Sequence, residues 1–315
     1  MSAYKQNGAT EYDAGSGISS RAQTISKSRR RRTVGTPRKS VLLTVVMLGM
    51  VVYSLTPVAW LVINSTKTQA SLFSTFGLWF SGPFALWDNI VTTFTYSDGE
   101  FGRWLLNTIL YVVVGGGGAT VIATLGGYAL AQFNFPGKRA VFAIIIGAIA
   151  IPGTALAVPT FLMFSAVGLT NSPWAVILPS LISPFGLYLI WIYATDAIPT
   201  ELLEAARVDG AGELRIFVSI ALRLLMPGFV TVLLFTFVAT WNNYFLPLIM
   251  LSDSRWFPLT VGLNNWNARP PSAGGELITN LIVTGSLIAI VPTVVIFLLM
   301  QRYWESGLAA GSVKE

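Results

Sequence analysis

The chain has 315 residues, of which 53% are hydrophobic and only 11% are charged. A soluble domain usually carries about 25% charged residues, so this composition predicts an integral membrane protein. The sequence contains neither cysteine nor histidine. That excludes disulfides, thiol chemistry and the common zinc and haem ligands, and it removes the side chain that most often acts as a base near neutral pH.

The N-terminal part of the sequence is a basic tail followed by an apolar segment. Residues 1–40 are rich in Ser, Gly and Arg and hold nine of the 20 Lys and Arg residues, so we expect a disordered cytoplasmic tail. The basic run 29–32 fits a nucleic-acid or lipid patch, but a topology determinant is the favoured interpretation. Segment 41–63 is uncharged and is predicted as the first transmembrane helix. It is too long for a signal peptide, so we expect a permanent anchor.

Segment 64–103 is predicted as an extracytoplasmic loop rich in aromatic residues. Aromatic side chains favour the membrane–water interface, which is the preferred interpretation here. Stacking on sugar rings is the alternative. The aromatic residues concerned are Trp79, Phe80, Trp87, Phe94, Tyr96 and Trp104.

Five more apolar segments are long enough to cross a membrane. A lipid-exposed backbone must satisfy its own hydrogen bonds, and uncharged runs of this length exclude a barrel, so these segments are predicted helices. The expected fold is therefore an all-α integral membrane protein with six transmembrane helices. The five segments are 104–133, 140–167, 174–195, 224–251 and 277–300, within a transmembrane domain spanning 104–302.

The positions of Lys and Arg predict the orientation of these helices. Sixteen of the 20 lie in alternate connections or in the termini, on one side of the membrane. Cytoplasmic loops carry the excess of Lys and Arg in membrane proteins. We therefore expect residues 1–40, the loop 196–222 and the tail 303–315 to be cytoplasmic. The same distribution explains the net charge of +6 without a nucleic-acid partner.

Glycine and proline mark irregular points within the predicted spans. The run Gly115 to Gly118 permits either close helix packing or a hinge, and packing is the favoured interpretation. Pro152, Gly153 and Pro159 predict a broken helix in segment 140–167 because proline lacks a backbone donor.

The spans lack the groups that would supply energy for transport. No Asp or Glu lies in the middle of a span, and the sequence has no phosphate-binding G-x-x-x-x-G-K-[ST] loop. Active transport would thus need energy from another subunit. Neutral polar residues occur in the spans instead, where they either contact a sugar or bond neighbouring helices, the second being favoured. Residues considered for lining a translocation path are Asn107, Pro152, Trp241, Asn242 and Asn243.

The cytoplasmic loop 196–222 contains signals for a short helix. Thr200 is expected as its N-cap, Glu201 and Glu204 favour its first turns, and Gly210 is expected to end it. A helix of only about nine residues is marginal alone in water and needs a surface. From the residues alone, docking on a cytoplasmic partner and an ordinary interfacial helix are equally open.

Several short motifs occur in order along the chain. They are Asn107-Thr108, Gly127-Tyr128-Ala129-Leu130-Ala131, Phe135-Pro136-Gly137-Lys138, Ile151-Pro152-Gly153, the segment 198–210, and a C-terminal run from Gly307-Leu308 to Val313-Lys314. Together they resemble the permease subunits of carbohydrate ABC importers, and the sequence is similar to the smaller maltose-type permease from about residue 84 to residue 315.

This resemblance implies a type I ABC importer permease in the cytoplasmic (inner) membrane of a prokaryote. It implies a second permease subunit, two ATPase subunits that bind ATP and Mg²⁺, and an extracytoplasmic solute-binding protein. This chain would bind no cofactor, form half of the translocation pathway and catalyse no reaction. The expected ATPase-coupling residues, within 201–212, are Glu201, Glu204, Ala205, Ala206, Asp209, Gly210 and Gly212; Gly307, Gly311 and Lys314 are expected as a C-terminal contact.

The sequence departs from the family pattern at two positions. Arg223 stands where the family usually has proline, which predicts a straighter helix with an extra charge. Asn243 stands where an acidic residue is frequent. A secondary transporter or a channel subunit is the alternative function. A membrane enzyme is least favoured because His, Cys and buried carboxylates are missing.

Overall fold

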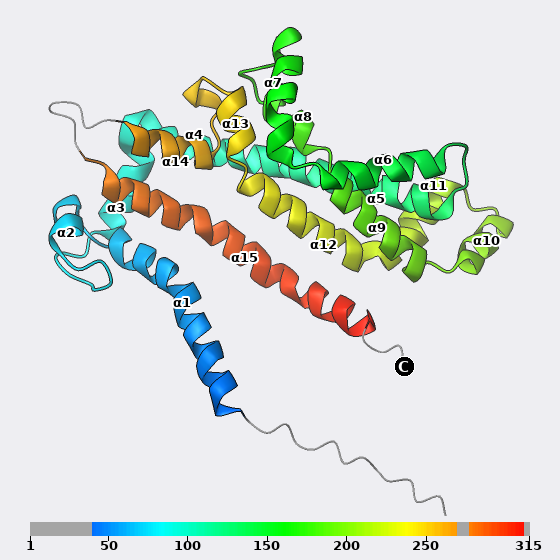
Figure 1. Ribbon diagram of the computed structural model, residues 1–315, viewed down its shortest axis with the longest axis horizontal. Coiled ribbons are helices and arrows are strands. Elements are labelled where there is room, and N and C mark those ends of the chain that lie inside the picture. The colour runs from blue at the N-terminus through cyan, green and yellow to red at the C-terminus, as the bar shows by residue number, and fades with distance from the viewer. Residues whose placement is uncertain (1–39, 270–276, 312–315) are drawn as a thin grey trace, which may run out of the picture. The chain divides into compact units, whose positions relative to one another are not determined.

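The computed structural model describes residues 40–269 and 277–311, with side chains described up to Gln301. The expected tail 1–40 lies outside the described residues apart from Ser40. Within the described residues the structure is helical and contains no strand, which confirms an all-α fold (Figure 1). Five of its helices are long and apolar enough to cross a membrane, or six if one bent pair counts as a single span. Residues up to Met50 form a separate unit, described only as the first turns of α1.

The segment expected as an extracytoplasmic loop contains short helices. Helix α1 (Val41–Ser65) is followed by α2 (Gln69–Ser74), α3 (Leu86–Thr95) and the 3₁₀ turn η1 (Tyr96–Gly99). The next span begins with α4 (Glu100–Leu110), four residues before the expected start at Trp104. Trp104 was expected at the membrane–water interface, but the structure contradicts this expectation. Its indole is fully buried, because it packs against aromatic side chains from distant helices.

The glycine run in this span lies at a close helix contact. After α4, the chain passes through the π-helical segment η2 (Tyr111–Gly116) into α5 (Gly117–Gln132). A Cβ added to Gly115 would lie 2.8 Å from the Ser180 Cβ, and one added to Gly116 would lie 3.2 Å from the Thr236 carbonyl oxygen. These distances confirm close packing as the role of both glycines.

The segment expected as one span over 140–167 is two helices. Helix α6 (Lys138–Ala150) ends before Pro152, and η3 (Gly153–Leu156) leads into α7 (Ala157–Ala166) at an angle of 100° between the two halves. Proline cannot donate the hydrogen bond that would continue α6. The predicted break is therefore present, and it is a sharp turn of the chain.

Other expected spans also end or break at identifiable residues. Segment 174–195 is α8 (Trp174–Ser180) and α9 (Pro184–Ala197), and Ser183 caps α9 by accepting a hydrogen bond from the Gly186 N–H at 3.2 Å. The loop 196–222, expected to be cytoplasmic, holds α10 (Thr200–Val208), described below.

The next helix is continuous from Glu213 to Trp241. Its parts are α11 (Glu213–Ile216), the π-helical segment η4 (Phe217–Ala221) and α12 (Leu222–Trp241). The span expected over 224–251 therefore ends ten residues early, because the backbone turns at Asn242 and restarts as α13 (Phe245–Met250). The 3₁₀ turn η5 (Ser254–Trp256), α14 (Leu259–Ala268) and α15 (Thr279–Gly311) complete the order.

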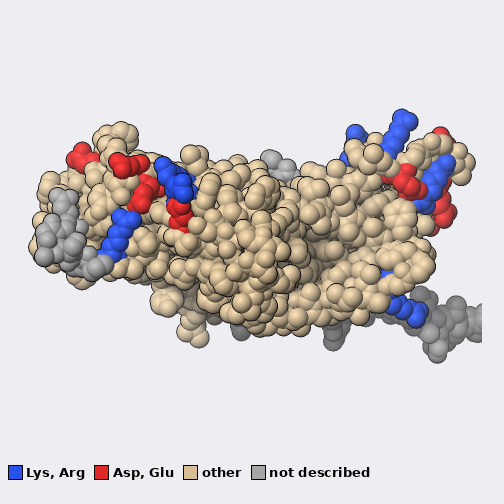
Figure 2. Space-filling model, turned by 90° about the horizontal axis from the view of Figure 1, so that it is seen from above, with Lys and Arg blue, Asp and Glu red and all other residues tan. Residues whose placement is uncertain are grey.

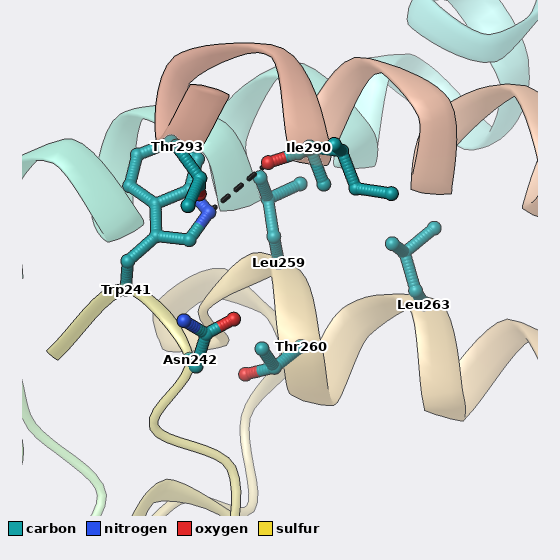
Figure 3. Close-up of a pocket in the computed structure, with 8 residues that line it drawn as sticks. Trp241, Asn242, Leu259, Thr260, Leu263, Ile290 and Thr293 are labelled. Carbon is teal, nitrogen blue, oxygen red and sulfur yellow. Dashed lines mark hydrogen bonds between the residues drawn. The ribbon is translucent and has the colours of Figure 1, made fainter. Parts of the chain in front are cut away.

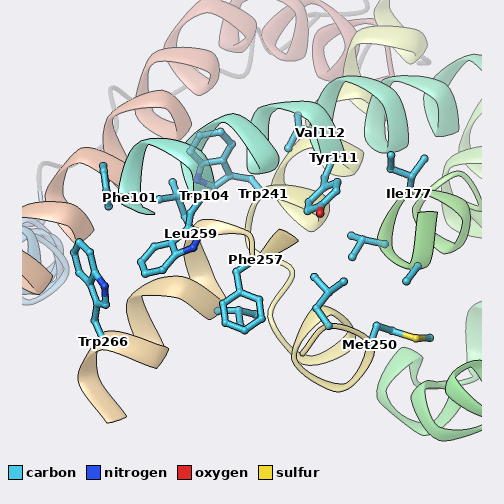
Figure 4. Packing of buried hydrophobic residues seen from close by; sticks show 14 of the residues in the cluster. Phe101, Trp104, Tyr111, Val112, Ile177, Trp241, Met250, Phe257, Leu259 and Trp266 are labelled. Atoms are coloured by element: carbon cyan, nitrogen blue, oxygen red, sulfur yellow. The ribbon is translucent and has the colours of Figure 1, made fainter. Parts of the chain in front are cut away.

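Buried side chains form two clusters. The first, here the aromatic cluster, includes Trp104, Tyr111, Trp241 and Trp266 and draws on α4, η2, α8 and α12 to α15 (Figure 4). The second, here the Leu203 cluster, joins α10 to three spans. It consists of Ala123, Tyr128, Ile190, Ala194, Ile198, Leu203, Ile216, Ala221, Leu225 and Val232.

Side chains of α4 hold the turn that precedes α14. Trp104 Nε1 donates to the Ser254 carbonyl at 3.0 Å, and Asn107 Nδ2 donates to the carbonyls of Arg255 and Phe257 at 2.8 and 3.0 Å. The two bonds from Asn107 satisfy backbone oxygens that no helix pairs, whereas the Ser254 carbonyl also accepts from the Phe257 N–H at 3.3 Å. The amide of Asn107 is therefore engaged in holding the fold.

Replacing Gly262 by alanine is expected to destabilise the aromatic cluster, because the added Cβ would overlap the Trp104 indole. Overpacking of this kind costs roughly 1–3 kcal/mol, so the Tm of the purified protein in detergent should fall. Gly147→Ala is the matched control, since no atom lies within 4 Å of the added methyl and alanine favours the helix. Equal Tm values for the two variants would contradict this packing.

Candidate functional site

Helix α10 presents most of the predicted coupling residues to the surface. Glu201, Glu204, Ala205 and Asp209 are exposed, and Ala206 is half-buried. The expected N-cap is wrong. Pro199 holds the last non-helical position with ψ of 129°, so Thr200 already belongs to the first turn and its side chain makes no capping bond.

The C-terminal end of α10 has the hydrogen bonds of a Schellman motif. The Gly210 N–H donates to the Arg207 carbonyl, and the Ala211 N–H donates to the Ala206 carbonyl, each at 3.0 Å. Gly210 adopts φ of 80°, which only glycine reaches without strain. The predicted end of the helix at Gly210 is confirmed. The turn carries Asp209, Gly210 and Gly212 on an exposed surface.

An ion pair closes this turn. Arg207 Nε lies 2.6 Å from Glu213 Oε1, and Arg207 Nη2 lies 3.3 Å from Glu213 Oε2, so the contact is bidentate. The hydrogen bond to Glu213 raises the pKa of the Arg207 guanidinium. Solvent screens an exposed pair, so its main effect is to fix the geometry between α10 and α11.

Leu203 attaches α10 to the membrane helices. Its side chain is buried, with 1% exposure, in the Leu203 cluster. The cluster partners come from α5 (Ala123), α9 (Ile190) and α12 (Leu225). A displacement of α10 must therefore move the packing of three spans, because close-packed side chains transmit strain.

Charged side chains gather at two ends of the face shown in Figure 2, with an uncharged surface between them. One group lies over α10 and α11. The other lies over the region of α3, α4 and α14. An uncharged band between two charged rims is the surface expected of a protein that crosses a membrane. No group of acidic side chains among the described residues is arranged to hold a metal ion.

A small cavity lies where α12 ends, against α14 and α15. It has a volume of about 180 Å³ and includes Trp241, Asn242, Thr260 and Thr293 in its lining (Figure 3). Trp241 Nε1 donates to the Ala289 carbonyl at 3.1 Å, which fixes the indole ring in the wall. The structure thus brings together Trp241 and Asn242 of the predicted path residues.

Other predicted path residues lie elsewhere. Asn243 is next to the cavity and its carbonyl accepts a hydrogen bond from Thr260 at 2.7 Å, whereas Asn107 and Pro152 are not among the lining residues. Sequence analysis missed Thr260 and Thr293. A single threonine in an apolar helix gives no signal, because its hydroxyl commonly bonds the helix backbone.

The remaining predicted residues are at the end of α15 and in α12. Gly307 and Gly311 fall in turns of α15 whose side chains are not described, and Lys314 lies outside the described residues. Arg223 is exposed, and the helix passes through it without a break, directly after the π-helical segment η4.

Replacing Gly210 by alanine is expected to weaken the end of α10, because a non-glycine residue at this φ costs about 1 kcal/mol. The amides of Gly210 and Ala211 should then exchange hydrogen about fivefold faster. Gly212→Ala is the matched control, since Gly212 has φ of −71° and equally open surroundings. Equal exchange in both variants would contradict the capping role.

Comparison with known proteins is consistent with this arrangement. Residues 119–309 match the family described as "Binding-protein-dependent transport system inner membrane component". The lactose transport system permease protein LacG of Rhizobium radiobacter is 31% identical over 265 residues, covering 83% of this chain and 91% of that protein. The arabinooligosaccharides transport system permease protein AraQ of Bacillus subtilis (strain 168) is 30% identical over 223 residues, covering 70% and 77%.

A solved structure has the same fold. It is a bacterial ABC transporter involved in the import of the acidic polysaccharide alginate, with a TM-score of 0.74, 22% identity, and coverage of 85% of this chain and 99% of that chain. At this identity the likeness shows the fold alone. The family match covers more than half of the sequence. The chain therefore belongs to the family of binding-protein-dependent transport system inner membrane components, the permease subunits of ABC importers.

Proposed function

We propose that this chain forms half of the translocation pathway of an ATP-driven importer of oligosaccharides or disaccharides. The names of its relatives, which include lactose and arabinooligosaccharide permeases, support a sugar substrate. The missing phosphate-binding loop supports an energy source on another subunit. No observation favours the alternative of a secondary transporter or channel. The chain itself would catalyse no reaction.

The site of coupling would be helix α10 with its turn. The observation that carries this proposal is that an exposed nine-residue helix is attached to the membrane helices by buried Leu203 and half-buried Ala206. So short a helix is marginal in water and gains from a groove in a partner. Glu204, Ala205 and Asp209 would contact an ATPase subunit, and two such subunits would bind ATP and Mg²⁺. Gly307, Gly311 and Lys314 are proposed as a second contact.

Coupling would follow from the packing of the Leu203 cluster. ATP binding closes the ATPase dimer and displaces α10. Leu203 then moves with its partners on α5, α9 and α12. The pathway between this chain and a second permease subunit would then close on one side of the membrane and open on the other. The Arg207–Glu213 pair keeps α10 and α11 together during this movement.

The pathway would include the cavity at the end of α12. Trp241 offers an aromatic face, while Asn242, Thr260 and Thr293 offer neutral polar groups, a combination suited to sugars. The excess of Lys and Arg on one side supports a cytoplasmic position for both termini and α10. An extracytoplasmic solute-binding protein would therefore deliver the sugar at the opposite side.

Replacing Glu204 by alanine is expected to weaken ATPase docking, because a group of the ATPase that is buried on binding would lose the Glu204 carboxylate as its partner. Sugar uptake by vesicles containing the complete complex, ATP and binding protein should fall roughly tenfold or more. Less ATPase should also co-purify. The control is Asp88→Ala, which removes an exposed carboxylate in the first turn of α3. Unchanged uptake in Glu204→Ala, or uptake driven by an ion gradient without the ATPase, would overturn the proposal.

Replacing Leu203 by alanine is expected to uncouple the complex while leaving the docking surface intact. A Leu→Ala change in a packed core usually costs about 2–5 kcal/mol, so α10 would move without its partners. ATPase co-purification should persist, while sugar imported per ATP hydrolysed falls. Leu202→Ala makes the same chemical change at an exposed neighbour and should keep this ratio. An unchanged ratio of sugar imported to ATP hydrolysed in Leu203→Ala would contradict the proposed role of Leu203 in transmission.

A further inference from the structure

The segment between α1 and α3 has its polar groups inside and its aromatic rings outside. This segment, residues 64–89, is here called the aromatic cap. Asn64, Lys67 and Asn89 are buried, with exposures of 1%, 0% and 4%. By contrast, six aromatic side chains are 58–73% exposed, namely Phe73, Phe76, Trp79, Phe80, Phe84 and Trp87. A loop folded for water has the opposite arrangement.

Hydrogen bonds from the buried side chains hold this arrangement. Lys67 Nζ donates to the Phe76 carbonyl at 2.8 Å, and Asn64 Nδ2 donates to the Gly77 carbonyl at 2.7 Å. Asn89 Nδ2 donates to the carbonyls of Ser65 and Lys67, each at 2.9 Å. These hydrogen bonds fix the backbone of the segment that carries the aromatic rings.

A further pair of bonds ties the cap to the last span. Asn280 Nδ2 donates to Asn89 Oδ1 at 2.8 Å, and the Asn280 N–H donates to Gln69 Oε1 at 2.9 Å. Asn280 lies in the first turn of α15. The exposed rings thus belong to a folded segment that is hydrogen-bonded to the transmembrane domain.

The surface of the cap carries one charged group, the exposed carboxylate of Asp88 near its C-terminal end. Residues 68–87 contain no Asp, Glu, Lys or Arg. Lys67, at the start of this stretch, is fully buried, and no carboxylate among the described residues forms an ion pair with it. Burying an ammonium group is costly, and its bond to the Phe76 carbonyl offsets part of this cost while leaving no cation on the surface of the cap.

The position of the cap identifies what covers this surface. The cap begins where α1 ends at Ser65, and the most apolar stretch of α1 has none of its residues buried within the protein. The exposed rings therefore continue the lipid-facing surface of a membrane span at the depth where that span meets the headgroups. Aromatic residues are enriched at this depth. A soluble partner that dissociates would leave this large apolar patch in water, whereas the bilayer is always present.

We propose that the aromatic cap is an anchor in the outer leaflet of the membrane. The six exposed rings insert at the boundary between lipid headgroups and acyl chains, and Lys67 and Asn89 hold them in that orientation. The anchor fixes the outer ends of α1 and α15 against the lipid. This role is separate from ATPase coupling and from sugar binding, and it does not depend on the identity of the transported solute.

The absence of cysteine from this chain permits a direct test. Phe76→Cys, Trp79→Cys and Trp87→Cys each place one thiol on the cap for a nitroxide spin label. The complete complex, with thiols of its other subunits removed, is reconstituted in vesicles of phosphatidylethanolamine and phosphatidylglycerol. Collision of each label with oxygen, which concentrates in lipid, is compared with collision with a water-soluble nickel chelate.

Two control positions calibrate the measurement. Leu55→Cys lies on an exposed face of α1 and reports lipid, while Ser97→Cys lies on an exposed turn and reports water. The cap labels are expected to match Leu55→Cys, with oxygen collisions exceeding nickel collisions. Values like those of Ser97→Cys would overturn the proposal. Protection from both reagents would also overturn it, since a protein partner would then cover the cap. Sugar uptake by each labelled complex checks that it is folded.

Discussion

The fold depends on the requirement that every backbone group away from water finds a hydrogen-bond partner. Helices meet this need internally, but this chain breaks its helices repeatedly, and each break frees carbonyl and N–H groups. Polar side chains from neighbouring elements then supply the missing partners. The clearest case is α4, where Asn107 donates to the carbonyls of Arg255 and Phe257, and the Thr108 hydroxyl accepts from the Leu259 N–H at 2.8 Å.

The same device recurs in the aromatic cap and at the end of α12. In the cap, Asn64, Lys67 and Asn89 donate to carbonyls outside helices or at a helix end, and after the end of α12 the Thr260 hydroxyl donates to the Asn243 carbonyl at 2.7 Å. Amides and hydroxyls in these spans consequently form hydrogen bonds mainly with backbone groups. A polar residue in a membrane helix is therefore weak evidence for a substrate site, unless, as at Asn242, it also lines a cavity.

Features set by local chemistry could be predicted from the sequence, and features set by distant contacts could not. The helix end at Gly210 and the break at Pro152 follow from single residues that lack a Cβ or a backbone donor. The early end of α12 was missed because two asparagines do not stop a helix by themselves. Trp104 was misplaced because its partner, Trp266, at 5.0 Å between ring centroids, is remote in sequence. For the same reason the cavity residues Thr260 and Thr293 gave no signal.

One helix joins the proposed docking turn to the proposed pathway. It starts at Glu213, paired with Arg207 of α10, and ends at Trp241 in the cavity wall. Arg223 lets it run through the position where proline would remove a backbone donor. Its hydrogen bonding is irregular at η4, beside the Leu203 cluster, and again at Pro227 within α12, which has no backbone donor. Because a π-helical segment commonly marks a functional irregularity, movement of α10 would be absorbed or redirected there, and α12 beyond it would carry the remainder to Trp241.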